Sequence, residues 1–348
     1  MKSRNVSIIG DRFMLSDIFE RALQERCGDF ALHIRKHDLA WPDQHMEHGY
    51  AVAGMDGLKE YVGSMEETLA LAIGSEIVIT QLAPFSKGIM EQLPDLKLIA
   101  VSRGGPVNID ISAARERGIK VVNTPGRNAS AVAEFTIGMI LAENRNITKG
   151  HDALRKGEYR GDLYRADVTG RELSEMTVGI IGYGQVGTRV VKLLKAFGCR
   201  ILVCDPYAQL SVQDLNDGVV QCSLETLLSQ SDVVSLHPRV TAETTNMMNA
   251  QSLRQMKKDA ILVNTARGPL MDYDALYEVM KSGHLRGAAL ETFAIEPVPP
   301  DLPLLQLPNV TLTPHIAGAS VKTVTYAASM AADAVYCYLN GAPLLNLC

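Results

Sequence analysis

Residues 177–205, TVGIIGYGQVGTRVVKLLKAFGCRILVCD, constrain the fold of this chain more than any other stretch. An apolar run ends at Gly182, and a helical pattern of apolar positions follows Gly187. A second apolar run then ends on Asp205. This succession is typical of a strand, a tight turn, a helix and a second strand, which together begin a parallel sheet.

Three glycines in this unit, Gly182, Gly184 and Gly187, form a G-x-G-x-x-G pattern. The first permits a tight turn, the second lets the backbone approach a pyrophosphate, and the third allows close packing of helix on strand. Asp205 lies 23 residues after Gly182, near the spacing of about 20 at which an acid binds a ribose 2′-hydroxyl. Its charge would repel a 2′-phosphate, so the unit predicts NAD rather than NADP. A glycine-rich turn in some other α/β unit is the alternative.

The length and charge of the chain limit what else it can be. Its 348 residues exceed what one hydrophobic core usually holds, which predicts two domains. Hydrophobic residues make up 47% and charged residues 21%, as in globular enzymes. The formal net charge of −5 gives no reason to expect nucleic acid or an anionic membrane as a partner.

The cysteines and the N-terminus favour a cytoplasmic protein. The six cysteines form no C-x-x-C pair and are expected to be reduced. The first residues, MKSRNVSIIGDRFM, lack the apolar core and cleavage site of a signal peptide, and no apolar run is long enough to span a membrane. His45 and His48 are spaced as a metal pair, but no further ligand completes a site, so a loop and no metal are predicted.

Apolar runs alternate with helical patterns along both halves of the chain, between residues 5 and 122 and again between residues 177 and 312. Such alternation predicts doubly wound parallel sheets in an α/β fold. Residues 130–155 carry a helical pattern that predicts one long helix between the two sheets.

Reactive side chains follow three predicted strands of the second half: Arg267, then Glu291 and Glu296, then His315. The carboxyl ends of parallel strands share one edge with the dinucleotide turn, so these groups are expected to converge beside a nicotinamide. Arg267 suits a carboxylate and carbonyl, because its planar fork never deprotonates. His315 suits proton transfer near neutral pH, and Glu296 would orient it and keep it charged. Alone, each of these residue types is more often structural.

At this point the sequence resembles the D-isomer-specific 2-hydroxyacid dehydrogenase family. Besides the G-x-G-x-x-G, the resemblance rests on segments that occur in the family's order: residues 103–110 (RGGPVNID), 118–125 (GIKVVNTP), 131–134 (AVAE), 235–237 (SLH), 263–268 (VNTARG), 296–297 (EP) and 313–318 (TPHIAG). The resemblance implies that Arg267, Glu296 and His315 form a catalytic trio acting on a 2-hydroxy or 2-keto acid.

The resemblance also implies binding residues. The expected NAD contacts are Gly182, Gly184, Gln185, Val186, Gly187, Asp205, His237, Pro238, Thr265 and Glu291. The expected substrate contacts are Arg103, Gly104 and Gly105, with the backbone amides of the two glycines holding the substrate carboxylate. Apart from the resemblance, the position of Gln81 at the end of a predicted strand favours either a further substrate contact or a solvent-exposed turn.

The resemblance further implies a Rossmann cofactor domain, residues 124–318, inserted into a flavodoxin-like substrate domain made of residues 1–123 and 319–348. The final helix would return to the first half, and a homodimer would form through the cofactor domain and the long helix. Glu291 departs from the family, which usually carries Asp there, so its side chain has a longer reach.

Two other functions stay open within this fold. One is an NAD-gated binding protein, as in the C-terminal-binding corepressors, which retain the same trio and turn over little or nothing. The other is formate dehydrogenase, which pairs its His with Gln, so Glu296 argues against it. The sequence does not identify the 2-hydroxy acid.

Overall fold

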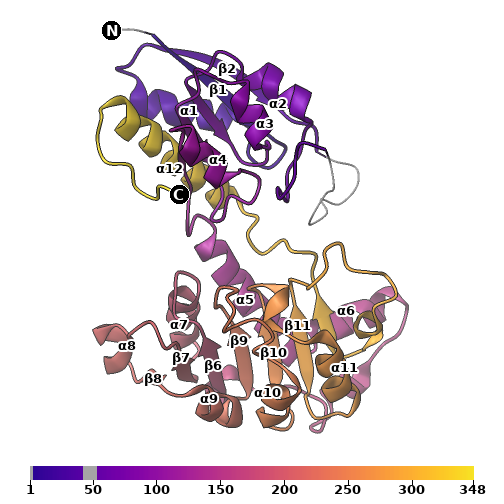
Figure 1. Ribbon diagram of the computed structural model, residues 1–348. Helices are drawn as coiled ribbons and strands as arrows, with labels where there is room; N and C mark the ends of the chain where they lie inside the picture. The colour runs from indigo at the N-terminus through magenta and orange to yellow at the C-terminus, as the bar shows by residue number, and fades with distance from the viewer. Residues whose placement is uncertain (1–2, 42–52) are drawn as a thin grey trace. The chain divides into compact units, whose positions relative to one another are not determined.

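The computed structural model describes residues 3–41 and 53–348 (Figure 1). The chain folds into two compact units, which we call unit 1 (Met1–Arg127 with Ser320–Cys348) and unit 2 (Asn128–Ala319). Along the described ranges, no helix is both long and apolar enough to cross a membrane. His45 and His48 lie outside the described residues.

Unit 1 is built around a five-stranded sheet in the order β2-β1-β3-β4-β5, with every neighbouring pair parallel. The strands are β1 (Arg4–Gly10), β2 (Leu32–Asp38), β3 (Ile77–Thr80), β4 (Leu98–Val101) and β5 (Lys120–Val122). The helices are α1 (Ser16–Cys27), α2 (Met65–Ala72), α3 (Lys87–Glu91), α4 (Ile111–Glu116) and α12 (Val321–Leu339). This order is the flavodoxin-like one, as predicted.

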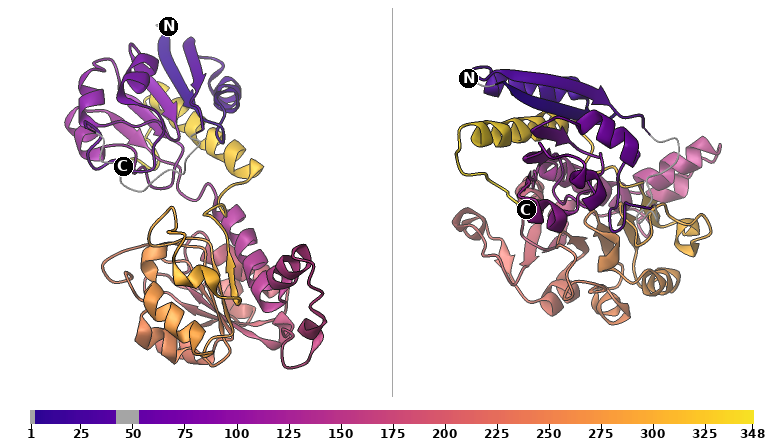
Figure 2. Two further views of the ribbon diagram at one scale, coloured as in Figure 1. Left: turned by 90° about the vertical axis from the view of Figure 1, so that its right-hand side faces the viewer. Right: turned by 45° about the horizontal axis from the view of Figure 1, so that its top comes forward.

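Helices cover both faces of this sheet. Apolar side chains of α2, α3 and α4 pack on one face, and those of α1 and α12 pack on the other. The helix α12, in yellow, lies beside α1 in Figures 1 and 2, although the two are far apart in sequence. Between them, Arg26 pairs with Asp333 at 2.5 Å and lies over the ring of Tyr336. The last helix therefore completes the core of the first half, as expected.

Unit 2 is built around a seven-stranded sheet in the order β12-β11-β10-β9-β6-β7-β8, again all parallel. Its strands are β6 (Thr177–Ile181), β7 (Arg200–Cys204), β8 (Val220–Gln221), β9 (Val233–Leu236), β10 (Ile261–Asn264), β11 (Gly287–Leu290) and β12 (Val310–Leu312). Counted from β6, this is the Rossmann order 3-2-1-4-5-6 with one strand added, so the predicted fold class is confirmed.

The helices of unit 2 also lie on both sheet faces. They are α5 (Ala129–Asn144), α6 (Ile147–Arg155), α7 (Gly187–Lys195), α8 (Val212–Asn216), α9 (Leu224–Gln230), α10 (Ala250–Gln255) and α11 (Tyr273–Lys281). Short 3₁₀ turns lie at Gly161–Tyr164, Leu173–Glu175, Gly268–Leu270 and Pro303–Gln306. Apolar side chains of α5 and α7 fill one core, and those of α9, α10 and α11 fill the other.

The prediction of one long helix over residues 130–155 is wrong. The chain forms two helices, α5 and α6, because Asn146 between them takes a left-handed conformation with φ of 55°. Asn adopts this conformation more readily than most residues. Its side-chain amide donates to the carbonyl of Val168 at 3.1 Å, which holds the bend in place.

Candidate active site

The glycine-rich turn between β6 and α7 has the close approaches that its sequence predicts. A Cβ on Gly182 would lie 2.7 Å from the backbone nitrogen of Pro238, and Gly182 has φ of 90°. A Cβ on Gly187 would lie 2.0 Å from the carbonyl oxygen of Gly182. Neither position accepts another residue. A Cβ on Gly184 would meet no atom within 4 Å, so this glycine faces open space at the start of α7.

Asp205 is tied to this turn. One carboxylate oxygen accepts the backbone N–H of Tyr183 at 2.7 Å, and the other accepts those of Tyr207 and Ala208 at 2.8 and 3.1 Å. The buried hydroxyl of Tyr183 donates to the carboxylate of Asp214. Tyr183 therefore fixes the turn from both its backbone and its side chain, a role that sequence reasoning missed although it lies between two of the glycines.

The other expected cofactor residues of this turn are also at its edge. Gln185 is exposed and Val186 half-buried, immediately before α7. His237 follows β9, and its imidazole shares a hydrogen bond of 2.9 Å with the hydroxyl of Ser235. Burial lowers the pKa of His237 to about 3, so its ring is neutral and takes no part in proton transfer near pH 7. Pro238, the next residue, lies against the glycine turn at Gly182.

Arg267 lies in a tight loop after β10. The side chain of Asn264 closes the loop, donating to the carbonyl of Arg267 and accepting from the N–H of Ala266, both at 3.0 Å. A Cβ on Gly268 would lie 2.0 Å from the carbonyl of Phe293, so this loop touches the segment that follows β11. Asn264 and Gly268 hold Arg267 in its place, and the contact across the loops could not be read from the sequence.

His315 and Glu296 form a hydrogen-bonded ion pair beyond β12 and β11. The imidazole Nδ1 lies 2.7 Å from one carboxylate oxygen of Glu296. The other oxygen accepts the N–H of Phe293 at 2.8 Å, which orients the carboxylate. Burial disfavours the charged imidazole, but the hydrogen bond and charge of Glu296 outweigh it and raise the pKa of His315. The side chain of His315 is 38% exposed, so its Nε2 side can reach a substrate.

Glu291 is hydrogen-bonded to the loop that bears His315. Its carboxylate accepts the backbone N–H of Ala317 at 2.8 Å, and its carbonyl accepts the N–H of His315 at 2.9 Å. Burial raises the pKa of Glu291 to about 7, against the lowering effect of the backbone amides of Ala317 and Ile316 and of the His315 charge. Thr265, the other residue expected near the carboxamide, is buried and shares a 2.7 Å hydrogen bond with Thr136 of α5.

The expected substrate residues all lie in unit 1, after β3 and β4. Gln81 is buried, and its side-chain oxygen has no hydrogen-bond partner in the described part of the chain. The guanidinium of Arg103 donates to the carbonyl and carboxylate of Glu60. Within the described ranges, the N–H groups of Gly104 and Gly105 donate no hydrogen bond, which leaves both available to a ligand.

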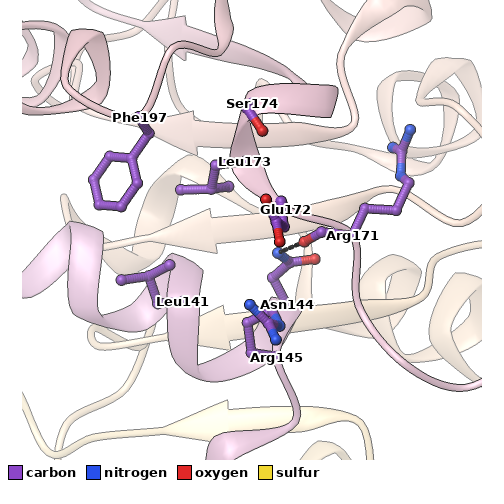
Figure 3. Close-up of a pocket in the computed structure, with 8 residues that line it drawn as sticks. All are labelled: Leu141, Asn144, Arg145, Arg171, Glu172, Leu173, Ser174 and Phe197. Carbon is purple, nitrogen blue, oxygen red and sulfur yellow. Dashed lines mark hydrogen bonds between the residues drawn. The ribbon is translucent and has the colours of Figure 1, made fainter. Parts of the chain in front are cut away.

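A cavity of about 200 Å³ in unit 2 lies elsewhere (Figure 3). Its lining comes from three segments: the end of α5, the segment before β6, and the turn after α7. The residues are Leu141, Asn144, Arg145, Arg171, Glu172, Leu173, Ser174 and Phe197. Figure 3 shows the side-chain amide of Asn144 bonded to the backbone carbonyl of Arg171. Because β6 begins here and the glycine turn follows its other end, this cavity is at the opposite edge of the sheet from His315.

The structure thus brings Glu291, Glu296 and His315 into one bonded cluster, with Arg267 close enough to affect the pKa of His315. The strands that carry them are neighbours at one end of the sheet, and the glycine turn lies at the same carboxyl edge. The close glycine contacts, the open space at Gly184 and the α7 N-terminus fit a dinucleotide. Among the described residues, no three His, Cys, Asp or Glu side chains gather as metal ligands would.

Comparison with known proteins shows which sequences and folds this chain resembles. Residues 137–317 match the model of the D-isomer specific 2-hydroxyacid dehydrogenase NAD binding domain. The chain is 38% identical to a glyoxylate reductase of Thermofilum pendens over 81% of this chain and 84% of that protein. It is 37% identical to a glycerate dehydrogenase of Methylorubrum extorquens over 82% and 90%. The apo structure of D-lactate dehydrogenase from Escherichia coli superposes with a TM-score of 0.75 at 27% identity, covering 99% of both chains.

Proposed function

Since the chain belongs to the D-isomer specific 2-hydroxyacid dehydrogenase family, and is therefore an NAD-dependent oxidoreductase, we propose that Arg267, Glu296 and His315 carry its chemistry. The reaction interconverts a D-2-hydroxy acid and its 2-keto acid. The observation that carries the assignment is the 2.7 Å contact of His315 with Glu296 at the edge that also bears the glycine turn.

His315 is the general acid and base. In the reducing direction its Nε2 gives a proton to the carbonyl oxygen, while NADH, when bound, supplies the hydride to the carbonyl carbon. In the oxidising direction the same nitrogen takes the hydroxyl proton. Glu296 holds Nδ1, which fixes the ring orientation and raises the pKa of His315, and this favours the charged imidazolium that gives the proton.

Arg267 binds the carboxylate and polarises the carbonyl of the substrate. Its guanidinium is exposed and bonds only the carbonyl of its neighbour Ala266, at 2.7 Å, among the described residues. A carboxylate would replace that contact with two charge-assisted hydrogen bonds. The developing negative charge on the carbonyl oxygen would be stabilised by the same cation.

The cofactor is held by the residues around the glycine turn. The amides at the start of α7, with Gln185 and Val186, face the pyrophosphate, and Asp205 accepts from the adenosine ribose. The fixed position of the Asp205 carboxylate supports this role, because Oδ2 accepts a single backbone amide and keeps a free lone pair. His237 and Pro238 border the pocket, and Thr265 and Glu291 lie near the carboxamide.

We assign substrate recognition to unit 1 and cofactor binding to unit 2. The free amides of Gly104 and Gly105 would hold the carboxylate of the acid, with Gln81 and Arg103 beside them. Relatives named glyoxylate reductase and glycerate dehydrogenase suggest which acids to test first.

A homodimer in the cytoplasm completes the proposal. The exposed apolar side chains of Ile147 and Leu154 on α6, and of Tyr159 and Tyr164 after it, support an interface on unit 2. Light scattering of the purified protein should give twice the mass of one chain. A monomer at assay concentration would contradict the proposed interface.

The test of the trio is a panel of 2-keto acids reduced with NADH and with NADPH: glyoxylate, pyruvate, hydroxypyruvate and 3-phosphohydroxypyruvate. Consumption of reduced nicotinamide is followed by its absorbance. His315→Ala should lower kcat by roughly 10²–10⁴, the usual contribution of a general acid. NADH binding, measured by fluorescence, should stay nearly unchanged.

His33→Ala is the matched control, because His33 is an exposed residue of β2 in unit 1. It should retain full activity. If His315→Ala kept activity within a few-fold of the wild type, another group would be the acid. A wild-type protein that binds NADH but reduces none of the acids would instead favour the corepressor-like function.

A further inference from the structure

Arg127 is a cation that, among the described residues, forms no hydrogen bond or ion pair with an acidic side chain. It follows β5 and is the last residue of the first segment of unit 1. Its Nη1 lies 3.9 Å from the sulfur of Met14, and among the described residues its side chain makes no hydrogen bond to a carboxylate. Cations removed from water are normally paired, because an unpaired one loses its hydration without compensation. Arg127 is therefore placed for a ligand.

Two charged neighbours define the surroundings of Arg127. Burial and the nearby charge of Arg103 lower the pKa of Arg127 to about 10, with Asp11 acting in the opposite direction. At that pKa the guanidinium is still charged at neutral pH. Arg103 is already neutralised by Glu60, while Oδ2 of Asp11 is buried with no hydrogen-bond partner in the described part of the chain. Asp11 is thus close to Arg127 without bonding to it.

The loop that bears Arg127 is bonded to the loop expected to bind substrate. The N–H of Thr124 donates to the carbonyl of Arg103 at 2.8 Å, and the side chain of Asn123 donates to the carbonyl of Gly104 at 2.9 Å. A Cβ on Gly104 would lie 4.0 Å from the Cα of Pro125. The loop with the free amides of Gly104 and Gly105 and the loop with Arg127 therefore lie side by side at one edge of the sheet.

Further polar atoms at this edge also lack partners. The side-chain oxygens of Gln81, Ser102 and Thr124 are buried and make no hydrogen bond within the described ranges. They follow β3, β4 and β5, whose carboxyl ends meet at the edge where ligands of open parallel sheets bind. Buried polar atoms without partners commonly mark a place completed by ligand or water.

We infer that the substrate is a 2-keto or 2-hydroxy acid with a second carboxylate at its far end, which Arg127 binds. This inference rests on the proposed function. The planar guanidinium matches a carboxylate bidentately. A phosphate, with more negative charge, would be disfavoured by the nearby Asp11 and by the engagement of Arg103 with Glu60.

The test compares two keto acids with the same carbon skeleton, 2-ketoglutarate and 2-ketovalerate, which lacks the terminal carboxylate. The wild type should show the higher kcat/KM with 2-ketoglutarate. Arg127→Gln should lower the ratio of the two values about tenfold to hundredfold, chiefly through KM, as expected for a charge-assisted pair. Arg127→Lys should restore part of the ratio because it keeps the charge and loses the fork.

Arg12→Gln is the matched control, an exposed arginine after β1 that should leave the ratio unchanged. Equal reduction of both keto acids by the wild type would overturn the inference while the proposed function stands. A loss with Arg127→Gln that is equal for both would show that Arg127 is only structural. Selective loss of 3-phosphohydroxypyruvate reduction would assign a phosphate instead. Reduction of no keto acid at all would reject the proposed function itself.

Should Arg127→Gln fail to fold, inhibition of the wild type decides. Glutarate should inhibit reduction competitively at lower concentration than pentanoate, which has the same length with a single carboxylate. Equal inhibition by the two would overturn the inference without any variant.

Discussion

Replacing Glu291 by Gln should stabilise the protein above neutral pH, an unusual outcome for a residue beside the proposed acid. The side chain is 1% exposed, and its carboxylate accepts the N–H of Ala317 at 2.8 Å. Gln keeps the length of the side chain and an oxygen to accept this hydrogen bond, while it removes the charge. The change therefore isolates the cost of burying an ionised carboxylate.

The magnitude follows from the pKa. Burial raises the pKa of Glu291 from 4.5 to about 7, a shift that corresponds to about 3 kcal/mol. Because the folded-state pKa is the higher one, the folded protein binds more protons between the two values. The stability contribution is complete below the unfolded-state pKa and is lost as pH rises through about 7. Above that pH the Gln variant should exceed the wild type by up to about 3 kcal/mol.

Urea denaturation of the cofactor-free protein measures this difference. At about pH 5 the two proteins should have similar free energies of unfolding, and at about pH 8 the variant should be more stable. Glu278→Gln is the control, since Glu278 is an exposed residue of α11 and should show no such pH dependence. A difference between Glu291→Gln and the wild type that is the same at both pH values would refute the reasoning.

Three further changes test the site. Glu296→Gln removes the main group that raises the pKa of His315, so the alkaline limb of the pH profile for keto-acid reduction should move to lower pH; an unmoved limb would contradict the pairing. Asp205→Ala should raise the KM for NAD and narrow the preference over NADP, and unchanged discrimination would reject the ribose assignment. Gly268→Ala places a methyl group 2.0 Å from a backbone carbonyl and should cost more than about 2 kcal/mol in thermal unfolding. Gly88→Ala, which meets nothing within 4 Å, should cost little.

The central strands and the residues that follow them could be predicted from the sequence because these parallel strands are buried on both faces, unlike the edge strands β2 and β8. Their apolar runs are continuous, and each ends where a polar residue must leave the core. The predicted strand over residues 310–312 is observed as β12, so His315 could be placed at the carboxyl edge. Its partner was inferred from charge, but the 2.7 Å contact depends on Phe293 turning the Glu296 carboxylate.

Short helices and breaks were harder to predict, because tertiary contacts decide them. The five-residue helices α3 and α8 are too short for a periodic apolar pattern, and they are held by the capping side chains of Ser86 and Ser211. The break at Asn146 falls within a helical pattern that continues on both sides, and the contact with Val168 that supports it is remote in sequence.

Arg127 shows the same limit for a functional residue. In the sequence it is one arginine in a loop, where a solvated surface charge is the ordinary reading. Only the fold surrounds it with Met14, Arg103 and Asp11, which come from loops after two other strands. The surroundings of Arg127 come from three loops, so no single segment of the sequence indicates that this arginine is buried.

Glu291 could be identified from the sequence, but its contacts could be seen only in the structure. The sequence identifies it as an acid where the family usually has Asp, with the charge kept and the reach longer. The structure shows what the added length contacts, because the carboxylate meets the N–H of Ala317 in the loop that bears His315. His315 itself has φ of 54°, a conformation that costs free energy for a residue with a Cβ and so needs support from neighbours. The carboxylate and the carbonyl of Glu291 both bond this loop, so the longer acid acts as its clamp, and shortening it to Asp should loosen His315 before it affects the cofactor.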